Sequence, residues 1–508
     1  MSQHRLDPAI LRAYDIRGVV GESLFAADAW VIGFAFAGVL RERCAAGQRP
    51  AVVVGCDGRL SSPMLEAALV QGLAHGGVDV IRIGLSTTPM LYYAEVALRE
   101  GLVPGPATGA VSGQQVQGGI QVTGSHNPKD HNGFKIVAAG APFFGQDIAM
   151  LGERIAQLGP VQAGAGGRFN LLARVLPRAA GVGGEIGAEQ GRVEACEFLV
   201  AYADRLLADL AGGNAEGLAA LRIGWDAGHG AAGPIVEALA ARLPGEHHLL
   251  FTDVDGHFPH HHPDPTVEEN LADLRNLVLS RHLDFGVAFD GDADRVGLVD
   301  GLGRVVWGDQ ILLILAQDLL VRRPGALILA DVKASQALFD GVAALGGRAQ
   351  MWKTGHSLIK SRMKETGAAL AGEMTGHLFF AEDWYGFDDA MLATLRLMAA
   401  SVRLGRSVAD LRSALPQMAS TPELRIPVAA GTAVALVAQV RDAVAATGGA
   451  MEDIDGIRVT TPEGWWLLRA SNTEAKLSAR AEGVDAAALA RVLADLDARL
   501  LAVGVVRG

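Results

Sequence analysis

Short apolar runs alternate with longer amphipathic segments along most of the chain. Residues 51–55 (AVVVG) precede an amphipathic segment at 61–77, and residues 221–228 (LRIGWDAG) precede another at 233–243. The same order recurs between 78 and 100. Short runs rich in β-branched residues predict buried strands, and longer segments with apolar residues three or four positions apart predict helices. Strand followed by helix, several times over, indicates α/β units with largely parallel sheets.

A second block of this kind fills the middle of the chain, and the tail differs from it. The block begins with a strand predicted at 283–289 and continues through a helix, a strand and a second helix between 309 and 347. The tail from about Gln417 has strands of its own and a terminal helix predicted at 485–503. These elements together indicate a small separate α+β domain.

The composition is that of a globular protein with several domains. The chain has 508 residues, of which 50% are hydrophobic and 20% charged, and this length corresponds to roughly three or four domains. Two glycine-rich stretches, near 105–119 and 179–191, are typical of flexible insertions or linkers. The formal net charge of −12 argues against a general nucleic-acid binder, because neutralising phosphates needs a basic surface. Any anionic ligand must therefore be held by local positive groups.

The cysteines and the apolar segments indicate in which cellular compartment the protein is expected. Cys44, Cys56 and Cys196 lack the spacing of metal ligands, which argues against a zinc site and against a disulfide framework and fits a reducing compartment. The amino terminus lacks the apolar core of a signal peptide, and the longest apolar stretches, such as 30–40, are shorter than the ~18 residues that span a membrane. We therefore expect a soluble, cytoplasmic protein with no membrane partner.

One serine stands between a glycine and a histidine in the stretch 121–130 (QVTGSHNPKD). Gly, Asn, Pro and Asp are common turn residues, and the residue before Pro128 is biased away from helix. On its own the stretch is typical of a surface turn in which Ser125 bonds to nearby backbone. It becomes a candidate for chemistry only together with other parts of the chain.

The segment FDGDADR places three aspartates at alternating positions directly after an apolar strand. Three carboxylates this close repel one another, and a bound cation is the simplest way to bury them. Oxygen ligands favour magnesium over zinc, and Gly291 would allow a tight bend in the loop. The alternative is an acidic surface turn, which can have the same sequence. Arg295 can bridge the carboxylates or reach a phosphate. The candidate metal ligands are Asp290, Asp292 and Asp294.

A divalent cation and a serine in one protein suggest phosphoryl transfer. The metal neutralises developing charge, and a hydroxyl oxygen carries the group. Ser125 would be that carrier, and the nearby Lys135 and His126 could steady the transferred group or move protons. Taken singly, each of these two is better explained as an ordinary loop cation or a solvated imidazole.

Two later loops have the residue types that recognise a sugar phosphate. The segment GEMTGH offers a carboxylate and a hydroxyl, Glu373 and Thr375, which suit adjacent sugar hydroxyls, although a polar turn is the alternative. The segment RASNT offers a guanidinium, two hydroxyls and an amide, which suit a phosphate that does not react, although a helix cap is the alternative. Its candidate residues are Arg469, Ser471, Asn472 and Thr473.

Together these loops, in this order, resemble those of the α-D-phosphohexomutases. The resemblance covers nearly the whole chain and rests on five motifs: LRAYDIRGVVG, TGSHNP, DGDADR, GEMTGH and RASNT. The letters GEM and the segment WKTGHSLIK, with Lys353 and His356, look like the phosphomannomutase/phosphoglucomutase branch.

The resemblance implies an α/β fold of four domains around a central cleft. Three similar mixed α/β domains would be followed by a smaller C-terminal α+β domain, and each would supply one loop. The implied domains are 1–172 with the phosphoserine loop, 173–304 with the metal loop, 305–416 with the sugar loop and 417–508 with the phosphate loop.

The resemblance also implies an isomerase that shuttles a phosphoryl group. Ser125 would rest as a phosphoserine, with its phosphate as a further ligand of Mg²⁺ beside the three aspartates. It would exchange its phosphoryl group with hexose 1-phosphate or hexose 6-phosphate, through a hexose 1,6-bisphosphate that turns end for end. Its partners would be small-molecule sugar phosphates of mannose and glucose, with no nucleic acid and no membrane, and the protein would act as a monomer or small homo-oligomer.

Further site residues follow from the resemblance alone. Residues that match cleft positions of the family are Tyr14, Arg17, Lys333 and His356, and Lys135 and His377 are candidates for proton handling. Several cations can share the work, because phosphoryl transfer depends mainly on positioning and charge neutralisation. The expected catalytic set is Ser125, Lys135, His126, Arg17 and His377, with His377 also expected to bind substrate.

Four positions depart from the family pattern. Ala293 replaces a glycine in the metal loop, and we expect this to be tolerated only if its backbone avoids positive φ. Thr375 replaces a serine in the sugar loop, AGHG at 227–230 replaces a segment with asparagine, and Ala475 stands where a proline is common.

Three other activities remain open at the level of sequence. They are a phosphoglucosamine mutase, a non-catalytic sugar-phosphate-binding protein on the same fold, and a phosphatase-like enzyme. The intact serine and aspartates favour catalysis, and a second phosphate site favours a mutase over a phosphatase. Mannose and glucose phosphates differ only at the 2-hydroxyl, so we expect both to be substrates.

Overall fold

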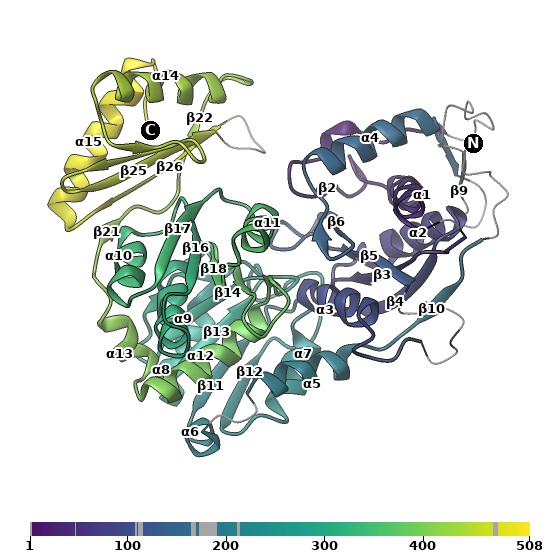
Figure 1. Cartoon of the computed structure of the whole chain (residues 1–508), viewed down its shortest axis with the longest axis horizontal. Coiled ribbons are helices and arrows are strands. Elements are labelled where there is room, and N and C mark those ends of the chain that lie inside the picture. Colours follow the sequence, from purple (N-terminus) through teal and green to yellow (C-terminus); the bar gives the residue numbers. More distant parts are fainter. Residues whose placement is uncertain are drawn as a thin grey trace. The chain divides into compact units, whose positions relative to one another are not determined.

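The computed structural model describes residues 3–45, 47–106, 109, 115–163, 169–171, 190–210, 214–470 and 476–507 (Figure 1). The chain divides into two compact units. Unit 1 contains residues 1–306 and 376–409, and unit 2 contains residues 307–375 and 410–508. None of the helices in the described ranges combines the length and apolar character needed to cross a bilayer.

The first sheet of unit 1 is mixed, with a parallel centre. Its strand order is β10-β4-β3-β5-β6-β2, with β7 beside β6. The first four strands in that order are parallel, and β6 is antiparallel to both β5 and β2. The strands are β2 (Ile16–Val19), β3 (Ala51–Cys56), β4 (Asp79–Leu85), β5 (Val116–Val122), β6 (His131–Ala138), β7 (Ala141–Pro142) and β10 (Val193–Ala195).

Helices cover both faces of this sheet. Neighbouring residues of a strand point to opposite faces. A Cβ on Gly118 would meet Phe36 and Leu40 of α1, and a Cβ on Gly119 would meet Leu91 of α3, so α1 and α3 lie on opposite faces. The helices are α1 (Ala26–Arg43), α2 (Ser62–His75), α3 (Thr88–Arg99) and α4 (Gln146–Leu158). The short strands β1 (Gln3–His4), β8 (Val161–Ala163) and β9 (Phe169–Leu171) form a separate antiparallel sheet.

The second sheet of unit 1 carries the metal loop. Its order is β12-β11-β13-β14-β15, with β11 parallel to β12 and β13, and the last three strands antiparallel. Its apolar strand β13 is fully buried, as the sequence predicted. The strands are β11 (Arg222–Asp226), β12 (Glu246–Leu250), β13 (Phe285–Phe289), β14 (Val296–Asp300) and β15 (Val305–Val306). The other elements of this part are α5 (Leu199–Asp209), α6 (Ala215–Ala219), α7 (Gly233–Ala240), α8 (Ala272–Arg281), β19 (Leu378–Phe380), β20 (Phe387–Asp388) and α12 (Ala390–Leu404).

Unit 2 begins with three parallel strands in the order β17-β16-β18. The strands are β16 (Leu327–Asp331), β17 (Arg348–Trp352) and β18 (Leu370–Gly372). The accompanying helices are α9 (Gly308–Arg322), α10 (Gln336–Ala344) and α11 (His356–Thr366), and α13 (Val408–Ser413) follows α12 along the chain. The alternation of strand and helix predicted between 309 and 347 is confirmed.

The tail is an antiparallel sheet with two helices, which confirms the predicted α+β character. Its order is β21-β26-β25-β24-β23, with β22 beside β26. Apolar residues of both helices share one core with the sheet, among them Val440, Val444, Leu496 and Leu500. The elements are β21 (Ala419–Ser420), β22 (Leu424–Pro427), α14 (Ala433–Ala446), β23 (Met451–Glu452), β24 (Ile457–Thr461), β25 (Gly464–Ala470), β26 (Lys476–Gly483) and α15 (Ala486–Ala502). The four domain limits predicted from the sequence stay predictions.

Left-handed backbone occurs at non-glycine residues in loops at the carboxyl ends of strands. Ser125 has φ of 50°, His229 has φ of 57° and Ala293 has φ of 58°. The expectation that alanine is tolerated at position 293 only if its backbone avoids positive φ is therefore wrong. The methyl group is accepted in a conformation that costs an alanine roughly 1–2 kcal/mol, so the surrounding contacts must hold the loop.

We expect Ala293→Gly to stabilise unit 1. Glycine adopts positive φ without strain, and the gain should be about 1 kcal/mol in the free energy of unfolding. Denaturant unfolding in the presence of a chelator measures this without a contribution from bound metal. The matched control is Ala67→Gly in the exposed part of α2, which should lower the same quantity by about 1 kcal/mol. Equal losses in the two variants would contradict the assignment of strain to Ala293.

Candidate active site

The serine loop connects the parallel strand β5 to the antiparallel strand β6. It places Ser125 in the interior, where the residue is 2% exposed. The hydroxyl Oγ donates a hydrogen bond to Oδ2 of Asp290 at 2.8 Å and lies 3.1 Å from Nδ1 of His126. The surface turn that the local letters suggest is therefore wrong, and the hydroxyl faces the metal loop.

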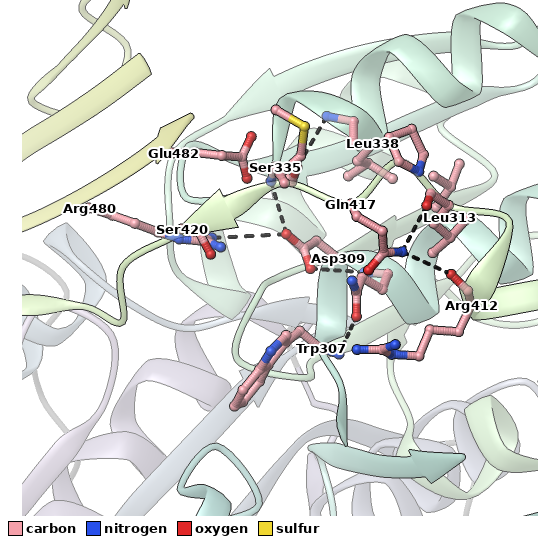
Figure 2. A pocket seen from close by; sticks show the side chains of 15 residues that line it. Trp307, Asp309, Leu313, Ser335, Leu338, Arg412, Gln417, Ser420, Arg480 and Glu482 are labelled. Atoms are coloured by element: carbon pink, nitrogen blue, oxygen red, sulfur yellow. Dashed lines mark hydrogen bonds and ion pairs between the residues drawn. The ribbon is translucent and has the colours of Figure 1, made fainter. Parts of the chain in front are cut away.

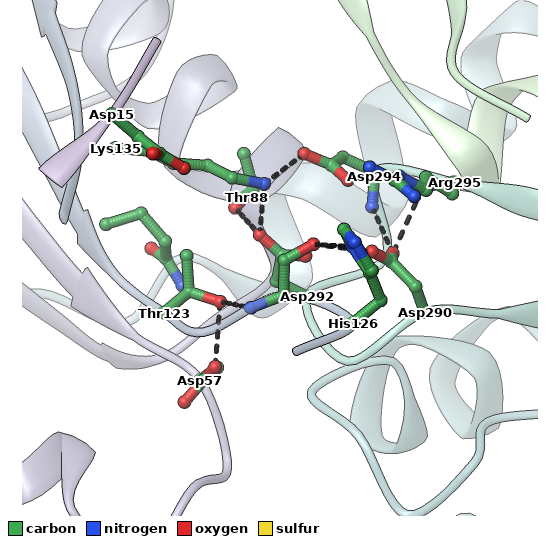
Figure 3. A network of polar contacts seen from close by, with 12 residues as sticks. Asp15, Asp57, Thr88, Thr123, His126, Lys135, Asp290, Asp292, Asp294 and Arg295 are labelled. Carbon is green, nitrogen blue, oxygen red and sulfur yellow. Dashed lines mark hydrogen bonds and ion pairs between the residues drawn. The ribbon is translucent and has the colours of Figure 1, made fainter. Parts of the chain in front are cut away.

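The metal loop follows β13, and its three carboxylates lie close to Thr88 and Lys135 (Figure 3). Asp290, Asp292 and Asp294 are 0% exposed, and each offers an oxygen within 4.8 Å of an oxygen of the others. Backbone N–H groups of Asp294 and Arg295 donate to Oδ1 of Asp290 at 3.1 and 3.2 Å. The sequence predicted the grouping of these three carboxylates correctly.

Glycine is required at position 291 for a different reason from the one that the sequence suggests. Gly291 was expected to allow a tight bend, yet the positive φ falls at Ala293 instead. A Cβ on Gly291 would lie 2.4 Å from the carbonyl oxygen of Ser125. Glycine is therefore needed because the metal loop packs directly on the serine loop.

One lysine balances part of the charge of the three aspartates. Lys135, on β6, donates to Oδ2 of Asp292 at 2.6 Å and also contacts Oδ2 of Asp294. Thr88, at the start of α3, donates its hydroxyl to Oδ2 of Asp292 at 2.5 Å. Oδ1 of Asp292 and Oδ1 of Asp294 are buried with no hydrogen-bond partner among the described residues.

The electrostatics of this cluster fit a bound cation. Burial, together with Asp292 and Asp294, raises the pKa of Asp290 well above its usual value. Burial acts in the same direction on Asp292, but Lys135 outweighs it and lowers the pKa of Asp292. Lys135 and the nearby Arg295 supply two positive charges against three buried carboxylates, so negative charge stays unbalanced and oxygen atoms stay unsatisfied. The three aspartates thus form a site that can hold a metal ion, and hard oxygen ligands suit a hard cation.

His377 joins the same network from the segment after Thr375. Arg295 donates from Nε to Nε2 of His377 at 2.9 Å. Because an arginine cannot accept a hydrogen bond, Nε2 is the accepting nitrogen, and the ring proton sits on Nδ1. That Nδ1 lies 2.9 Å from Oδ2 of the buried Asp388. His377 is therefore held between a cation and a carboxylate beside the metal loop.

Arg17 and His126 both contact residues of the serine loop. Arg17, on β2, donates to Oδ1 of Asn127 at 2.8 Å and pairs with Asp15. Burial, followed by the nearby cations of which Arg295 is the strongest, lowers the pKa of His126 well below its usual value. Tyr14 precedes β2 and is partly exposed.

Four of the remaining predicted residues lie at the carboxyl ends of the parallel strands of unit 2. Lys333 follows β16, His356 begins α11 after β17, and Glu373 and Thr375 follow β18. Oε1 of Glu373 accepts a hydrogen bond of 2.6 Å from the N–H of Gly355. Carboxyl ends of parallel strands are where α/β sheets bind ligands.

The same edge carries a buried carboxylate that the sequence did not single out. Burial raises the pKa of Asp331 to about 6, although Lys333 opposes this with its ammonium group 3.9 Å away.

Asp455 accepts from the N–H of Thr354 at 3.2 Å and pairs with Arg469 at 3.2 Å. It thereby joins the loop before α11 to the end of β25. Ser471, Asn472 and Thr473 lie outside the described residues.

Unit 2 also has a pocket of about 150 Å³ beside α9, which contains none of the residues predicted from the sequence (Figure 2). Its buried charges include Asp309 and Arg480, which pair at 3.9 Å. Ser335 and Glu482 also line it. Its charges balance internally, so it does not compete with the aspartate cluster as the candidate active site.

Sequence reasoning missed four residues that complete the candidate site. Thr88 and Asp388 come from elements far along the chain, and no local spacing marks them. Asp57 and Arg59 stand in CDGRLSS, directly after the buried strand β3, where the same strand-then-polar-loop pattern that marked the metal loop could have found them. Both contact the backbone or side chains of the serine loop.

Comparison with protein families accounts for most of the chain. Models of the phosphoglucomutase/phosphomannomutase family match in order: the alpha/beta/alpha domain I at residues 9–159, domain II at 201–303, domain III at 307–419 and the C-terminal domain at 423–499.

Relatives of known name agree with these matches. The chain is 41% identical over 478 residues to a phosphomannomutase/phosphoglucomutase of Pseudomonas aeruginosa, covering 94% of this chain and 92% of that protein. It is 38% identical over 485 residues to a phosphoglucomutase of Neisseria gonorrhoeae, covering 95% of each. A crystal structure of a phosphoglucomutase/phosphomannomutase family protein from Burkholderia thailandensis superimposes with a TM-score of 0.83 at 39% identity, covering 98% of each chain. The resemblance seen in the sequence is confirmed: the chain belongs to the phosphoglucomutase/phosphomannomutase family.

Proposed function

We propose that this protein is a phosphomannomutase/phosphoglucomutase that reversibly interconverts hexose 1-phosphates and hexose 6-phosphates. The relatives at 37–41% identity carry these names. The observation that carries the proposal is the buried hydroxyl of Ser125, which hydrogen-bonds to one of three clustered aspartates. A hydroxyl held in this way beside a cation site is suited to carrying a phosphoryl group.

The metal in this proposal is Mg²⁺, held by the side chains of Asp290, Asp292 and Asp294 together with Ser125. When bound, it neutralises the negative charge that develops on the transferring oxygens. Lys135 contacts Asp292 and Asp294 and limits the net negative charge that the phosphoryl group meets. Arg295 adds a second positive charge beside the aspartates, and its hydrogen bond holds His377 in place.

His126 is a close partner for proton movement at Ser125. Nδ1 of His126 lies 3.1 Å from the serine oxygen, within reach of the hydroxyl proton when that oxygen takes up a phosphoryl group. Lys135, His377 and Arg17 are the other groups expected to share this work. Their common contribution is to position the loop and neutralise charge, which dominate phosphoryl transfer.

The substrate's sugar and its second phosphate would bind to the residues of unit 2. Glu373 and Thr375 would hold adjacent sugar hydroxyls in either orientation of the substrate. Lys333 and His356 would line the sugar, and Tyr14 and Arg17 stay predicted substrate-binding residues. Arg469 would hold the phosphate that does not react, together with Ser471, Asn472 and Thr473. A hexose 1,6-bisphosphate would be both intermediate and activator. The expected cytoplasmic location, and assembly as a monomer or small homo-oligomer, stay predictions.

Replacing Ser125 by alanine should remove nearly all turnover, because the phosphoryl carrier is lost. A coupled assay with glucose 1-phosphate and catalytic glucose 1,6-bisphosphate measures turnover, and intact-mass spectrometry measures the attached phosphoryl group. Ser280→Ala, on the exposed side of α8, is the matched control and should leave both unchanged. Full turnover of the Ser125→Ala variant would reject the covalent scheme.

Removal of the metal should abolish turnover without unfolding the protein. The three aspartates lose their neutralising ion, but Lys135 still balances part of their charge and keeps the loops together. Activity and far-UV circular dichroism are followed after chelation and after addition of Mg²⁺. We expect activity to vanish on chelation and to return on addition of Mg²⁺, while the circular dichroism stays constant. Unchanged turnover in chelator would argue against any metal in the reaction.

Both mannose 1-phosphate and glucose 1-phosphate should be substrates. A single changed contact at the 2-hydroxyl is worth about 1–3 kcal/mol, which an adaptable site need not use for discrimination. The measurement is kcat/KM for the two compounds, with glucosamine 1-phosphate as a third. A preference beyond about a thousandfold, or about 4 kcal/mol, would contradict dual specificity. A preference for glucosamine 1-phosphate would instead favour a phosphoglucosamine mutase.

A further inference from the structure

Ser125 has an unusual backbone conformation for a residue expected to react. Its φ of 50° lies in the left-handed region, and the residue is nearly fully buried. A serine has no intrinsic preference for that region, so neighbouring groups must hold it there. Because φ sets the direction of the Cα–Cβ bond relative to the loop, those neighbouring groups also determine where Oγ points.

One side chain, Arg59, makes most of the contacts that hold the serine loop's backbone. It is 1% exposed. Its Nη2 donates to the carbonyl oxygens of Ser125 and Asn127, each at 2.6 Å. Its Nη1 donates to the carbonyl oxygens of Pro128 and His131, at 2.6 and 3.0 Å. A single guanidinium thus fixes four carbonyl groups between Ser125 and the start of β6.

Asp57 holds the other half of the loop and orients the arginine. Its Oδ2 accepts from the hydroxyl of Thr123 at 2.7 Å and from the N–H of Gly124 at 3.1 Å. Its Oδ1 accepts from the N–H of Arg59 at 3.0 Å. The hydroxyl oxygen of Thr123 in turn accepts from the N–H of Ser125 at 2.8 Å. The backbone on both sides of the serine is therefore tied to the segment after β3.

The loop sequence is shaped around this guanidinium. A Cβ on Gly124 would lie 2.5 Å from Cζ of Arg59, so only glycine leaves room for the arginine at that position. The ring of Phe258 lies on the guanidinium as well, with its centroid 5.5 Å from Cζ. A planar fork with five donors suits several carbonyl groups at once, whereas the ammonium of a lysine offers three donors at one point.

We propose that Arg59 is a positioning residue for the phosphoryl carrier. It makes no contact with Oγ of Ser125; it fixes the backbone so that Oγ faces Asp290. The inference rests on the proposed function, because it assigns to Ser125 the role of accepting and giving a phosphoryl group. A loosened loop would still bind sugar phosphate through other residues, but its hydroxyl would be misaligned in the transfer step.

Arg59→Lys tests this, since it keeps the charge and removes the fork. A misplacement of about 1 Å at a reacting atom costs about a hundredfold in rate. We therefore expect kcat to fall by about a hundredfold, while KM for glucose 1-phosphate stays within about threefold of the wild-type value. Intact-mass spectrometry should show correspondingly slow phosphorylation of Ser125 by glucose 1,6-bisphosphate. Rates are expressed per folded molecule, determined by circular dichroism.

Arg396→Lys in α12 is the matched control. Arg396 is also largely buried and bonds to Asp209 at 2.8 and 3.0 Å and to the carbonyl oxygen of Glu382 at 2.8 Å, but it has no contact with the serine loop. Its replacement should leave kcat within about threefold of wild type. Equal losses of kcat in the two variants would show a general effect of removing a buried arginine and would overturn the proposal.

Gly124→Ala tests the same contact without changing Arg59 and applies if Arg59→Lys fails to fold. The added methyl group must displace the guanidinium, so the same fall in kcat at nearly constant KM is expected. Wild-type kcat in a folded Arg59→Lys or Gly124→Ala variant overturns the role of Arg59 and leaves the proposed function intact. A wild-type protein with neither turnover nor phosphoserine overturns both.

Discussion

Three carboxylates buried beside one another are the constraint on which the rest of the candidate site depends. Asp290, Asp292 and Asp294 are fully buried, with one lysine ammonium in contact with two of them. Such an arrangement is unfavourable in a low-dielectric interior unless further positive charge is supplied. The unsatisfied oxygens of Asp292 and Asp294 show where that charge is lacking. The imbalance makes the cluster a site that can hold a cation, and the hydroxyl of Ser125 donates to one of its carboxylates.

The fold meets the constraint by packing two loops from different sheets against each other. The metal loop follows β13 and the serine loop follows β5, and Gly291 lets their backbones approach closely. Both loops contain a non-glycine residue in the left-handed region, Ser125 and Ala293. Contacts from Asp57 and Arg59 hold the first of these in place. The site is thus a strained backbone stabilised by buried polar contacts, which is a usual way to preorganise a reactive group.

The sequence predicted the parts of this arrangement that have a local signal. Alternating apolar and amphipathic segments predicted the parallel sheets and the α+β tail, and aspartates directly after an apolar strand predicted the cluster at the end of β13. Long-range contacts have no such signal: Thr88 and Asp388 reach the cluster from α3 and β20, and only tertiary structure joins them to it. The role of glycine was also unpredictable, because close approach at Gly291 and positive φ at Ala293 depend on what packs around the loop. GEMTGH looked like one sugar-binding loop, yet His377 contacts Arg295 and Asp388 while Glu373 bonds to Gly355.

The central claim is that Ser125 lends its phosphoryl group to the sugar in every catalytic cycle. The most direct measurement is a rapid-quench single turnover in which protein carrying an isotopically labelled phosphoryl group meets unlabelled glucose 1-phosphate. The account predicts that label leaves the protein at least as fast as kcat and appears in glucose 1,6-bisphosphate before it appears in any monophosphate. Label that stays on the protein while glucose 6-phosphate accumulates would contradict it.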